Sequence, residues 1–180
     1  MNKKGKQYIF SMVTAALLIA LKIILERFLS YNVWNQRFGF SFIVVGFAAI
    51  TLGVPWAMAV SGVADIIGAL IFPTGPYFPG FTLTAVLTAL CTALFVRKNA
   101  TFLKVTASVL INQIFGSVLL NSLWISILYG KGFIALIPGR IMQAILMTVI
   151  QIVLTYALYG NKSEVRRRLL KMPVLSKVQA

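Results

Sequence analysis

The sequence predicts an all-α membrane protein with six transmembrane helices, and three observations lead to this fold class. Of the 180 residues, 59% are hydrophobic and only 11% are charged, whereas about a quarter of the residues of a soluble domain are charged. The apolar residues form six long runs separated by short polar segments, and the mean hydropathy is +0.91. The basic residues, which outnumber the acidic ones by 17 to 3, gather outside those runs, as in the loops of membrane proteins.

The six runs place the spans at residues 8–29, 40–54, 56–72, 81–96, 105–129 and 139–159. A helix needs about 20 apolar residues to cross the hydrocarbon core of a bilayer. The second, third and fourth runs are shorter, so we expect their ends to lie against protein or thinned bilayer, which suits a cavity between them. Residues 1–160 are predicted to form one transmembrane domain, and residues 161–180 a basic cytoplasmic tail.

The basic residues indicate which side of the membrane each loop faces. They gather near the N-terminus, between residues 97 and 104, and after residue 161. Cytoplasmic loops are enriched in Lys and Arg, and six spans bring these three segments to one side. We therefore expect both termini in the cytoplasm, with the tail lying on anionic lipid, and the other loops on the outer side, where a ligand would arrive.

The segment FPTGPYFPGFT at residues 72–82 interrupts two apolar runs with three prolines and two glycines. Proline breaks helical geometry, and irregular backbone at membrane depth is tolerated only where it is buried in protein or lines a cavity. The segment therefore predicts an outward-facing binding cavity, with Thr74, Phe78 and Phe81 as candidate ligand contacts.

A second outer segment, YNVWNQRFGFSF at residues 31–42, combines a cation with aromatic side chains. The Arg37 guanidinium offers a fork of donors to an anion, and Trp34 offers a flat apolar surface to a ring. Alternatively, Trp34 anchors the chain at the membrane interface, where aromatic residues gather whatever the function.

Asp65 is the only acidic residue deep inside an apolar run. An unpaired carboxylate is costly in hydrocarbon, so it needs a partner. Two interpretations stay open. Asp65 forms a structural ion pair with Arg37 or Lys22, or it accepts hydrogen bonds from the amino and ring N–H groups of a ligand.

Polar side chains recur on one face of the fifth run. Asn121 and Trp124 lie in its outer half, on a stripe that also carries Gln113 and Ser117 at helical spacing. The stripe indicates either polar contacts between helices or ligand contacts, for which Asn121 and Trp124 are the better candidates.

The sixth run carries a comparable stripe that begins with Arg140 and Gln143. Pro138 and Gly139 immediately precede Arg140, so we expect the helix to begin there. A helix N-terminus favours anions, which makes Arg140 a candidate for binding a ligand carboxylate and Gln143 a neighbouring contact.

Small residues four positions apart occur in two spans: Ala16 and Ala20 in the first, and Ala85, Ala89 and Ala93 in the fourth. Small residues at this spacing let another helix approach closely in lipid. Either set could serve packing inside the bundle or docking of a partner.

The composition argues against catalysis. The chain has one cysteine and no histidine, so the commonest metal ligand and general base is missing, and no site for a metal or for a cofactor is expected. Two rivals from other classes stay open: a small integral membrane enzyme acting on lipid through Glu26 and Arg27, and a structural membrane subunit with no ligand.

The chain resembles the substrate-binding S components of energy-coupling factor (ECF) transporters, and among these the folate-specific members. Four features carry the resemblance: the six spans with the alanine pair of the first, RFGFSF at 37–42, ADIIGALIFPTGPYFPGFTLTA at 64–85, and IPGR at 137–140. The resemblance covers essentially the whole chain, and the long block at 64–85 is its most specific part.

The resemblance implies a multi-pass protein of the bacterial cell membrane that captures folate from outside without catalysis. Its implied partners are a transmembrane coupling protein, which would meet Ala16 and Ala20, and two ATPase subunits that use ATP. An S component for another aromatic vitamin, such as riboflavin or thiamine, is the alternative within the family. A pterin ring would suit the aromatic side chains together with Asp65 and Asn121, and a glutamate tail would suit Arg37 and Arg140.

Overall fold

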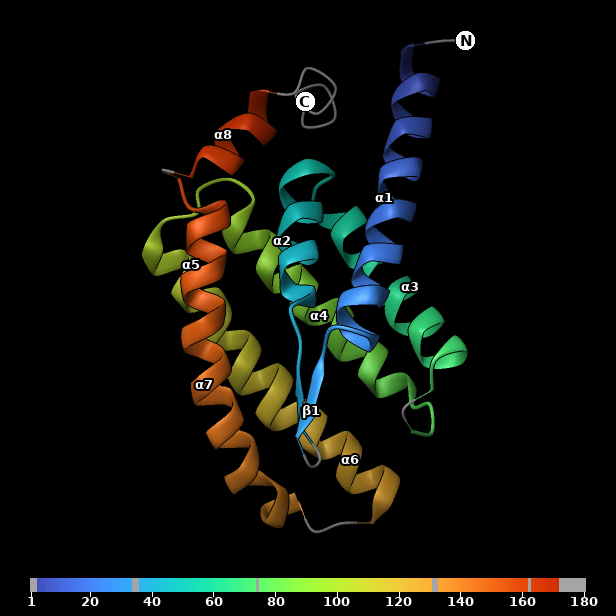
Figure 1. Cartoon of the computed structure of the whole chain (residues 1–180), viewed down its shortest axis with the longest axis vertical. Coiled ribbons are helices and arrows are strands. Elements are labelled where there is room, and N and C mark those ends of the chain that lie inside the picture. Colours follow the sequence, from blue (N-terminus) through green and yellow to red (C-terminus); the bar gives the residue numbers. More distant parts are fainter. Residues whose placement is uncertain (1–2, 34–35, 74, 131–132, 162, 172–180) are drawn as a thin grey trace.

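The computed structural model describes residues 3–33, 36–73, 75–130, 133–161 and 163–171. Within them the chain forms a bundle of helices with one small two-stranded sheet (Figure 1), which confirms the predicted all-α fold class. In chain order the helices are α1 (Lys3–Arg27), α2 (Ser41–Thr51), α3 (Val54–Ile71), α4 (Pro79–Val96), α5 (Phe102–Ile111), the π-helix η1 (Asn112–Leu120), α6 (Asn121–Tyr129), α7 (Phe133–Tyr159) and α8 (Glu164–Lys171).

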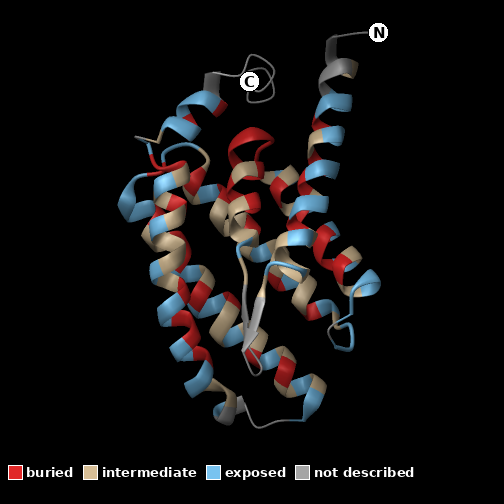
Figure 2. Ribbon diagram, in the orientation of Figure 1, coloured by how far each residue is buried: buried red, intermediate tan, exposed pale blue. Residues whose placement is uncertain are grey.

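Within the described residues, five helical segments are long and apolar enough to cross a bilayer: Tyr8–Arg27, Val54–Ile71, Pro79–Val96, Phe102–Tyr129 and Leu136–Tyr159. Helix α2, which corresponds to the second predicted span, has only 11 residues. These rise about 16 Å, against a hydrocarbon thickness of about 30 Å. Most of α2 is buried among the longer helices (Figure 2). Its C-terminal part therefore lies against protein, and Leu52 just after it is also buried.

The breaks between spans follow the glycines and prolines of the sequence. Gly53 turns the chain from α2 into α3 with φ of 93°, a conformation that suits glycine because it has no Cβ. Pro55 lies in the first turn of α3, and Pro79 is the first residue of α4, where a missing backbone N–H breaks no helical hydrogen bond. The proline-rich stretch before Pro79 is irregular, as predicted.

A β-hairpin that the sequence analysis did not predict connects α1 to α2. Strands β1 (Tyr31–Val33) and β2 (Gln36–Phe38) pair antiparallel, with Tyr31 opposite Phe38 and Val33 opposite Gln36. The hairpin extends away from the chain termini toward the α6–α7 end of the bundle (Figure 1).

The fifth span is continuous through α5, η1 and α6, but its centre is a π-helix of nine residues. Helical turns of this type are rare and occur frequently at functional sites. Gly116 brings η1 close to α4, because a Cβ at this position would lie 2.7 Å from Thr88 Cγ2. The widened turns therefore lie directly against the fourth span.

Small residues pack the core where the helices cross. One hydrophobic core cluster contains residues of α1, α2, α3 and α4, such as Leu18, Val44 and Ala57. A second cluster contains residues of α2, α4, α5, α7 and α8. Ala89 and Ala93 of α4 are fully buried. Of the two open interpretations of the alanines in the fourth span, the structure thus supports packing inside the bundle for these two.

The C-terminal helix α8 is fastened to the bundle by Arg166. Its guanidinium donates hydrogen bonds to the carbonyls of Val96 (2.8 Å), Arg97 (2.8 Å), Lys98 (2.8 Å) and Tyr159 (3.2 Å). These carbonyls lie at or just past the C-termini of α4 and α7, where helices leave acceptors without partners. Burial lowers the pKa of Arg166, yet an arginine stays protonated in proteins.

The sixth span begins earlier than predicted. Helix α7 starts at Phe133 and contains Pro138 in its interior, so Arg140 lies two turns inside the helix and not on its first turn. Proline is tolerated inside membrane helices because neighbouring groups satisfy the backbone that it leaves unpaired. The argument from a helix N-terminus was therefore wrong for Arg140, and only its own charge can attract an anion.

The three basic segments lie at one end of the molecule. The start of α1 and helix α8 are both at the end marked by the two termini (Figure 1), and the bonds of Arg166 hold the segment after α4 beside α8. This agrees with the expectation that the three segments share a side. Which side of the membrane they face stays a prediction, as does the division of the chain at residue 160.

Candidate ligand-binding cavity

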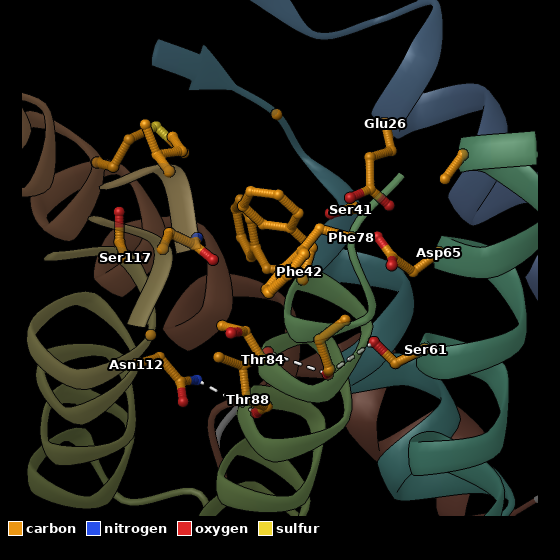
Figure 3. Close-up of a pocket in the computed structure, with 18 of the residues that line it drawn as sticks. Glu26, Ser41, Phe42, Ser61, Asp65, Phe78, Thr84, Thr88, Asn112 and Ser117 are labelled. Carbon is orange, nitrogen blue, oxygen red and sulfur yellow. Dashed lines mark hydrogen bonds between the residues drawn. The ribbon is translucent and has the colours of Figure 1, made fainter. Parts of the chain in front are cut away.

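A cavity of about 470 Å³ opens among α1, α3, α4, the fifth span and α7. Ligand sites in proteins commonly measure about 300–1,000 Å³. The cavity lies between the helix ends that are remote from the termini, and polar and aromatic side chains project into it from several elements (Figure 3). It has the size and the mixed lining of a small-molecule site.

The proline-rich segment borders this cavity, as predicted. Gly75, Pro76, Tyr77, Phe78 and Phe81 all line it. Phe72, Pro73, Gly75, Pro76 and Tyr77 are exposed, so the segment forms the mouth and not the floor. Thr74, also a predicted contact, lies outside the described residues.

Aromatic contacts fasten the mouth to the fifth span. The ring centroids of Phe78 and Trp124 are 5.6 Å apart, and those of Phe78 and Phe81 are 6.2 Å apart. Trp124 Nε1 donates to Thr84 Oγ1 at 2.9 Å. Trp124 does not line the cavity itself, so its predicted role as a direct contact becomes support for Phe78.

Asp65 lines the cavity and is nine-tenths buried. Its carboxylate accepts a hydrogen bond from Thr82 Oγ1 at 2.7 Å, and Thr82 Oγ1 lies 3.2 Å from the Tyr77 hydroxyl. Lys22, one expected ionic partner, is instead bound to Glu26 at 2.7 Å. Asp65 therefore ties the start of α4 to α3 and still presents acceptor atoms to the cavity.

Three charged residues of α1 that were not predicted as site residues also line the cavity: Lys22, Glu26 and Arg27. Lys22 is 3% exposed, and Arg27 packs against Gly68, where an added Cβ would lie 3.0 Å from its Nε. A signal was present in the sequence, since an ion pair at positions i and i+4 at the end of an apolar run marks a polar interior.

Arg140 and Gln143 face the cavity from α7, as predicted. Arg140 is 8% exposed, and its Nη1 donates to the carbonyl of Ser117 in η1 at 3.1 Å. That is the hydrogen bond found for Arg140 among the described residues, although a guanidinium carries five N–H donors. A buried cation with donors to spare lies beside an open cavity.

The predicted face of the fifth span also turns inward. Gln113, Ser117 and Asn121 line the cavity together with Asn112. Of these, Asn121 was the predicted ligand contact, while Asn112 and Gln113 lie nearer the chain termini along the span and extend the polar lining to that end.

The hairpin residues are only partly described. Arg37 belongs to strand β2, opposite Asn32, but its side chain is outside the described part of the structure. Trp34 lies outside the described residues. Their roles as ligand contacts stay predictions.

Ala16 and Ala20 lie on the exposed face of α1, away from the core, whereas Ala15 and Leu18 are buried. Ala16 borders a shallow apolar groove between α1 and α3, beside Met12 and Trp56. The two alanines are thus open to the surroundings, in contrast to Ala89 and Ala93.

Among the described residues, no group of three or more His, Cys, Asp or Glu side chains could hold a metal ion. The bundle and its polar cavity define a class of protein: a multi-pass membrane protein that encloses a binding site for a small polar ligand.

The comparisons with known proteins define the family. The model of the ECF transporter substrate-specific component matches residues 10–159, and the chain belongs to this family. Members of this family are the substrate-binding parts of transporters and not enzymes. This confirms the expectation that the protein is not a catalyst.

Two relatives are each named folate transporter FolT. The protein of Clostridium novyi (strain NT) is 43% identical over 74 residues, which are 41% of this chain and 43% of the relative. The protein of Leuconostoc mesenteroides subsp. mesenteroides is 34% identical over 87 residues, which are 48% of this chain and 46% of the relative. The matched part of the chain thus spans a little under half the length of these two relatives.

A solved structure extends the similarity to nearly the whole fold. The crystal structure of FolT bound with folic acid superimposes with a TM-score of 0.77 at 31% identity, covering 87% of this chain and 94% of that one. The likeness therefore includes the helices that surround the cavity.

Proposed function

We propose that this protein binds folate in the cavity and delivers it as the S component of an ECF-type vitamin importer. The observation that carries the proposal is Arg140, a buried guanidinium beside the cavity that spends one hydrogen bond on Ser117. Its remaining donors suit a carboxylate, because charge-assisted pairs of this kind are the strong ones. The similarity to folate-binding relatives points to the same ligand class.

The rest of the cavity suits a flat heterocycle. Phe42, Phe78 and Phe81 supply aromatic surface, and Phe42 and Phe78 are drawn among the side chains that line the cavity (Figure 3). Asp65 and Asn121 supply polar atoms for ring nitrogens and amino groups. A pterin would be held between the aromatic rings, while its acidic tail would reach Arg140 or the predicted Arg37.

Calorimetry with the purified protein tests this proposal. We expect tight binding of folic acid and no measurable heat with riboflavin or thiamine. Tight binding of either of those vitamins with no folate heat would instead indicate an S component for another vitamin. An absence of any ligand-dependent thermal shift would favour a structural subunit. A lipid-modifying activity that Glu26→Gln removes, without folate binding, would favour the enzyme.

We further propose that Ala16 and Ala20 dock the transmembrane coupling protein, which acts together with two ATPase subunits. Their exposure on α1 supports this role. The double variant Ala16→Trp/Ala20→Trp should abolish folate uptake by cells and leave binding by the purified protein intact. Val13 and Leu17 have the same spacing and are 54% and 67% exposed, so Val13→Trp/Leu17→Trp is the matched control. Equal loss of uptake in both variants would contradict the proposal.

The proposed location is the bacterial cell membrane, with the termini in the cytoplasm and the cavity open to the outside. The excess of basic residues at the end of the termini supports this orientation. In a Cys91→Ser background, a cysteine introduced at exposed Lys98 should react with an impermeant thiol reagent only after the cells are permeabilised. Reaction in intact cells would reverse the orientation.

A further inference from the structure

One side of the cavity carries hydroxyl groups that have already donated their hydrogens. Ser61 Oγ donates to the carbonyl of Ala85 at 3.0 Å, and Thr88 Oγ1 donates to the same carbonyl at 3.1 Å (Figure 3). A carbonyl can only accept, and a hydroxyl has one hydrogen. Ser61 and Thr88 therefore offer lone pairs, and no donor, to a ligand.

Thr84 repeats this arrangement nearer the mouth. Its Oγ1 donates to the carbonyl of Gly80 at 3.1 Å and accepts from Trp124 Nε1 at 2.9 Å. One lone pair is used by the indole, and the hydrogen is used by the backbone. Thr84 can therefore meet a ligand only as an acceptor.

The orientation of the Asn112 amide is fixed by the same logic. Its Nδ2 lies 2.9 Å from Thr92 Oγ1 and 3.4 Å from the carbonyl of Thr88, while Thr92 Oγ1 donates its own hydrogen to that carbonyl at 2.9 Å. The reversed amide would place its oxygen against two groups without a free hydrogen. The Asn112 nitrogen is therefore committed, and its Oδ1 is left for the cavity.

With the carboxylate of Asp65, these side chains form what we name the acceptor wall: Ser61, Asp65, Thr84, Thr88 and Asn112, all of which line the cavity. The cations lie on other elements, with Lys22 and Arg27 on α1 and Arg140 on α7. The α3–α4 side of the cavity thus offers hydrogen-bond acceptors and α7 offers the donors of Arg140, whereas on α1 Lys22 is paired with the Glu26 carboxylate.

We infer that the acceptor wall makes this protein select reduced folates over folic acid, an inference that rests on the proposed folate function. In oxidised pterin, N5 and N8 are lone-pair acceptors. In 7,8-dihydrofolate N8 carries a hydrogen, and in tetrahydrofolate both N5 and N8 do. The ring edge with the 2-amino group also includes N8, so reduction adds a donor to the edge that best matches the wall.

The cost of a mismatch sets the size of the effect. A ring nitrogen that presents a lone pair to a buried acceptor places two lone pairs against each other with no hydrogen between them, which sites of this kind reject strongly. One such bond changes affinity by about tenfold. Folic acid still binds through its amino group, its aromatic surface and its tail, but more weakly than its reduced forms.

Competition calorimetry on the full-length protein, under anaerobic conditions, compares folic acid with 7,8-dihydrofolate and tetrahydrofolate. We expect 7,8-dihydrofolate to bind at least about tenfold tighter than folic acid, and tetrahydrofolate no more weakly than dihydrofolate. Equal affinities, or tighter binding of folic acid, would overturn this inference and leave the proposed function standing. Failure of all three ligands to bind would overturn the proposed function, and this inference with it.

Single substitutions in the wall supply a second measurement. Thr88→Val and Ser61→Ala each remove one acceptor at nearly constant shape, and each should reduce the ratio of dihydrofolate to folic acid affinity severalfold. Thr106→Val is the matched control, because Thr106 lies on α5 outside the cavity lining and its Oγ1 has no hydrogen-bond partner among the described residues. An unchanged ratio in both wall variants would overturn the role of the wall, provided that their melting temperatures match that of the control.

Discussion

The two ends of the bundle each bury an arginine and use it differently. At the end of the termini, Arg166 is 3% exposed and donates to four backbone carbonyls. At the cavity end, Arg140 is 8% exposed and is found donating to one carbonyl, that of Ser117. Exposure therefore does not distinguish the two residues, but the number of donors already used does.

This difference separates a structural cation from one that is available to a ligand. A guanidinium whose donors are spent on helix C-termini holds those helices together and has little left to offer. A guanidinium that is buried beside a cavity with donors to spare still lacks partners, and an anionic ligand can provide them. We therefore expect substitutions at the end of the termini to lower thermal stability, and substitutions at the cavity end to lower the affinity for folic acid.

Arg166→Ala should have the largest effect, and it should fall on stability alone. The change removes four hydrogen bonds from a buried charged group, and we expect a loss of about 3 kcal/mol in the free energy of unfolding. Thermal unfolding in detergent measures it, and the affinity for folic acid should change less than twofold. The neighbouring Arg167→Ala, at an exposed position, is the control, and equal melting of the two variants would contradict the assignment.

Arg140→Ala should show the opposite pattern. We expect the affinity for folic acid to fall by about 1.5–3 kcal/mol, as for a charge-assisted hydrogen bond, with little loss of thermal stability. The affinity for pteroate, which lacks the glutamate, should be nearly unchanged in this variant. Arg37→Ala should behave likewise if its side chain also meets a carboxylate. Equal losses for folic acid and pteroate would mean that the acidic tail lies elsewhere.

Trp124→Phe should have a smaller effect that touches both properties. The change removes the hydrogen bond from Nε1 to Thr84 and leaves a smaller aromatic ring beside Phe78, so we expect a loss of about 1 kcal/mol in stability. Folic acid affinity should fall by a similar amount, because Phe78 loses support. Trp56→Phe is the comparison, since Trp56 lies beside Tyr8 at the other end of the bundle. A larger affinity loss for Trp56→Phe would contradict this view of the mouth.

Glu164→Gln should have the smallest effect. Its carboxylate lies 3.9 Å from Arg168 Nε, and the two side chains are 77% and 82% exposed. Exposed pairs of this kind contribute about 0.5 kcal/mol or less. A loss in melting temperature comparable to that of Arg166→Ala would show that α8 is held by its surface charges and not by its buried arginine.

The spans were predictable because each is a long apolar run bounded by proline, glycine or charge. Pro138 shows where this reasoning fails. Proline ends many helices, but α7 carries it in its interior, because the surrounding membrane bundle and not the local sequence sets the limits of the helix. The π-helix was missed for a related reason. It lies against the fourth span through the approach of Gly116 to Thr88, a tertiary contact that no local pattern reveals.

The site was predictable where a polar residue interrupts an apolar run. Asp65, Arg140, Gln143 and Asn121 were found in this way and all line the cavity. The hydroxyl groups of the acceptor wall were not predicted as ligand contacts. A threonine in a membrane helix commonly donates to its own backbone, so its presence in a sequence does not indicate a binding site. Their importance appears only when the bonds that they have already made can be counted.

The hairpin has a consequence for where water begins. A ribbon of two strands pairs only along its inner seam, so the N–H and C=O groups on its two outer rims need partners from elsewhere. Hydrocarbon provides none. Residues 31–33 and 36–38 must therefore stand in a wet vestibule or against other parts of the protein, and the lipid boundary on this side of the molecule cannot extend across both rims.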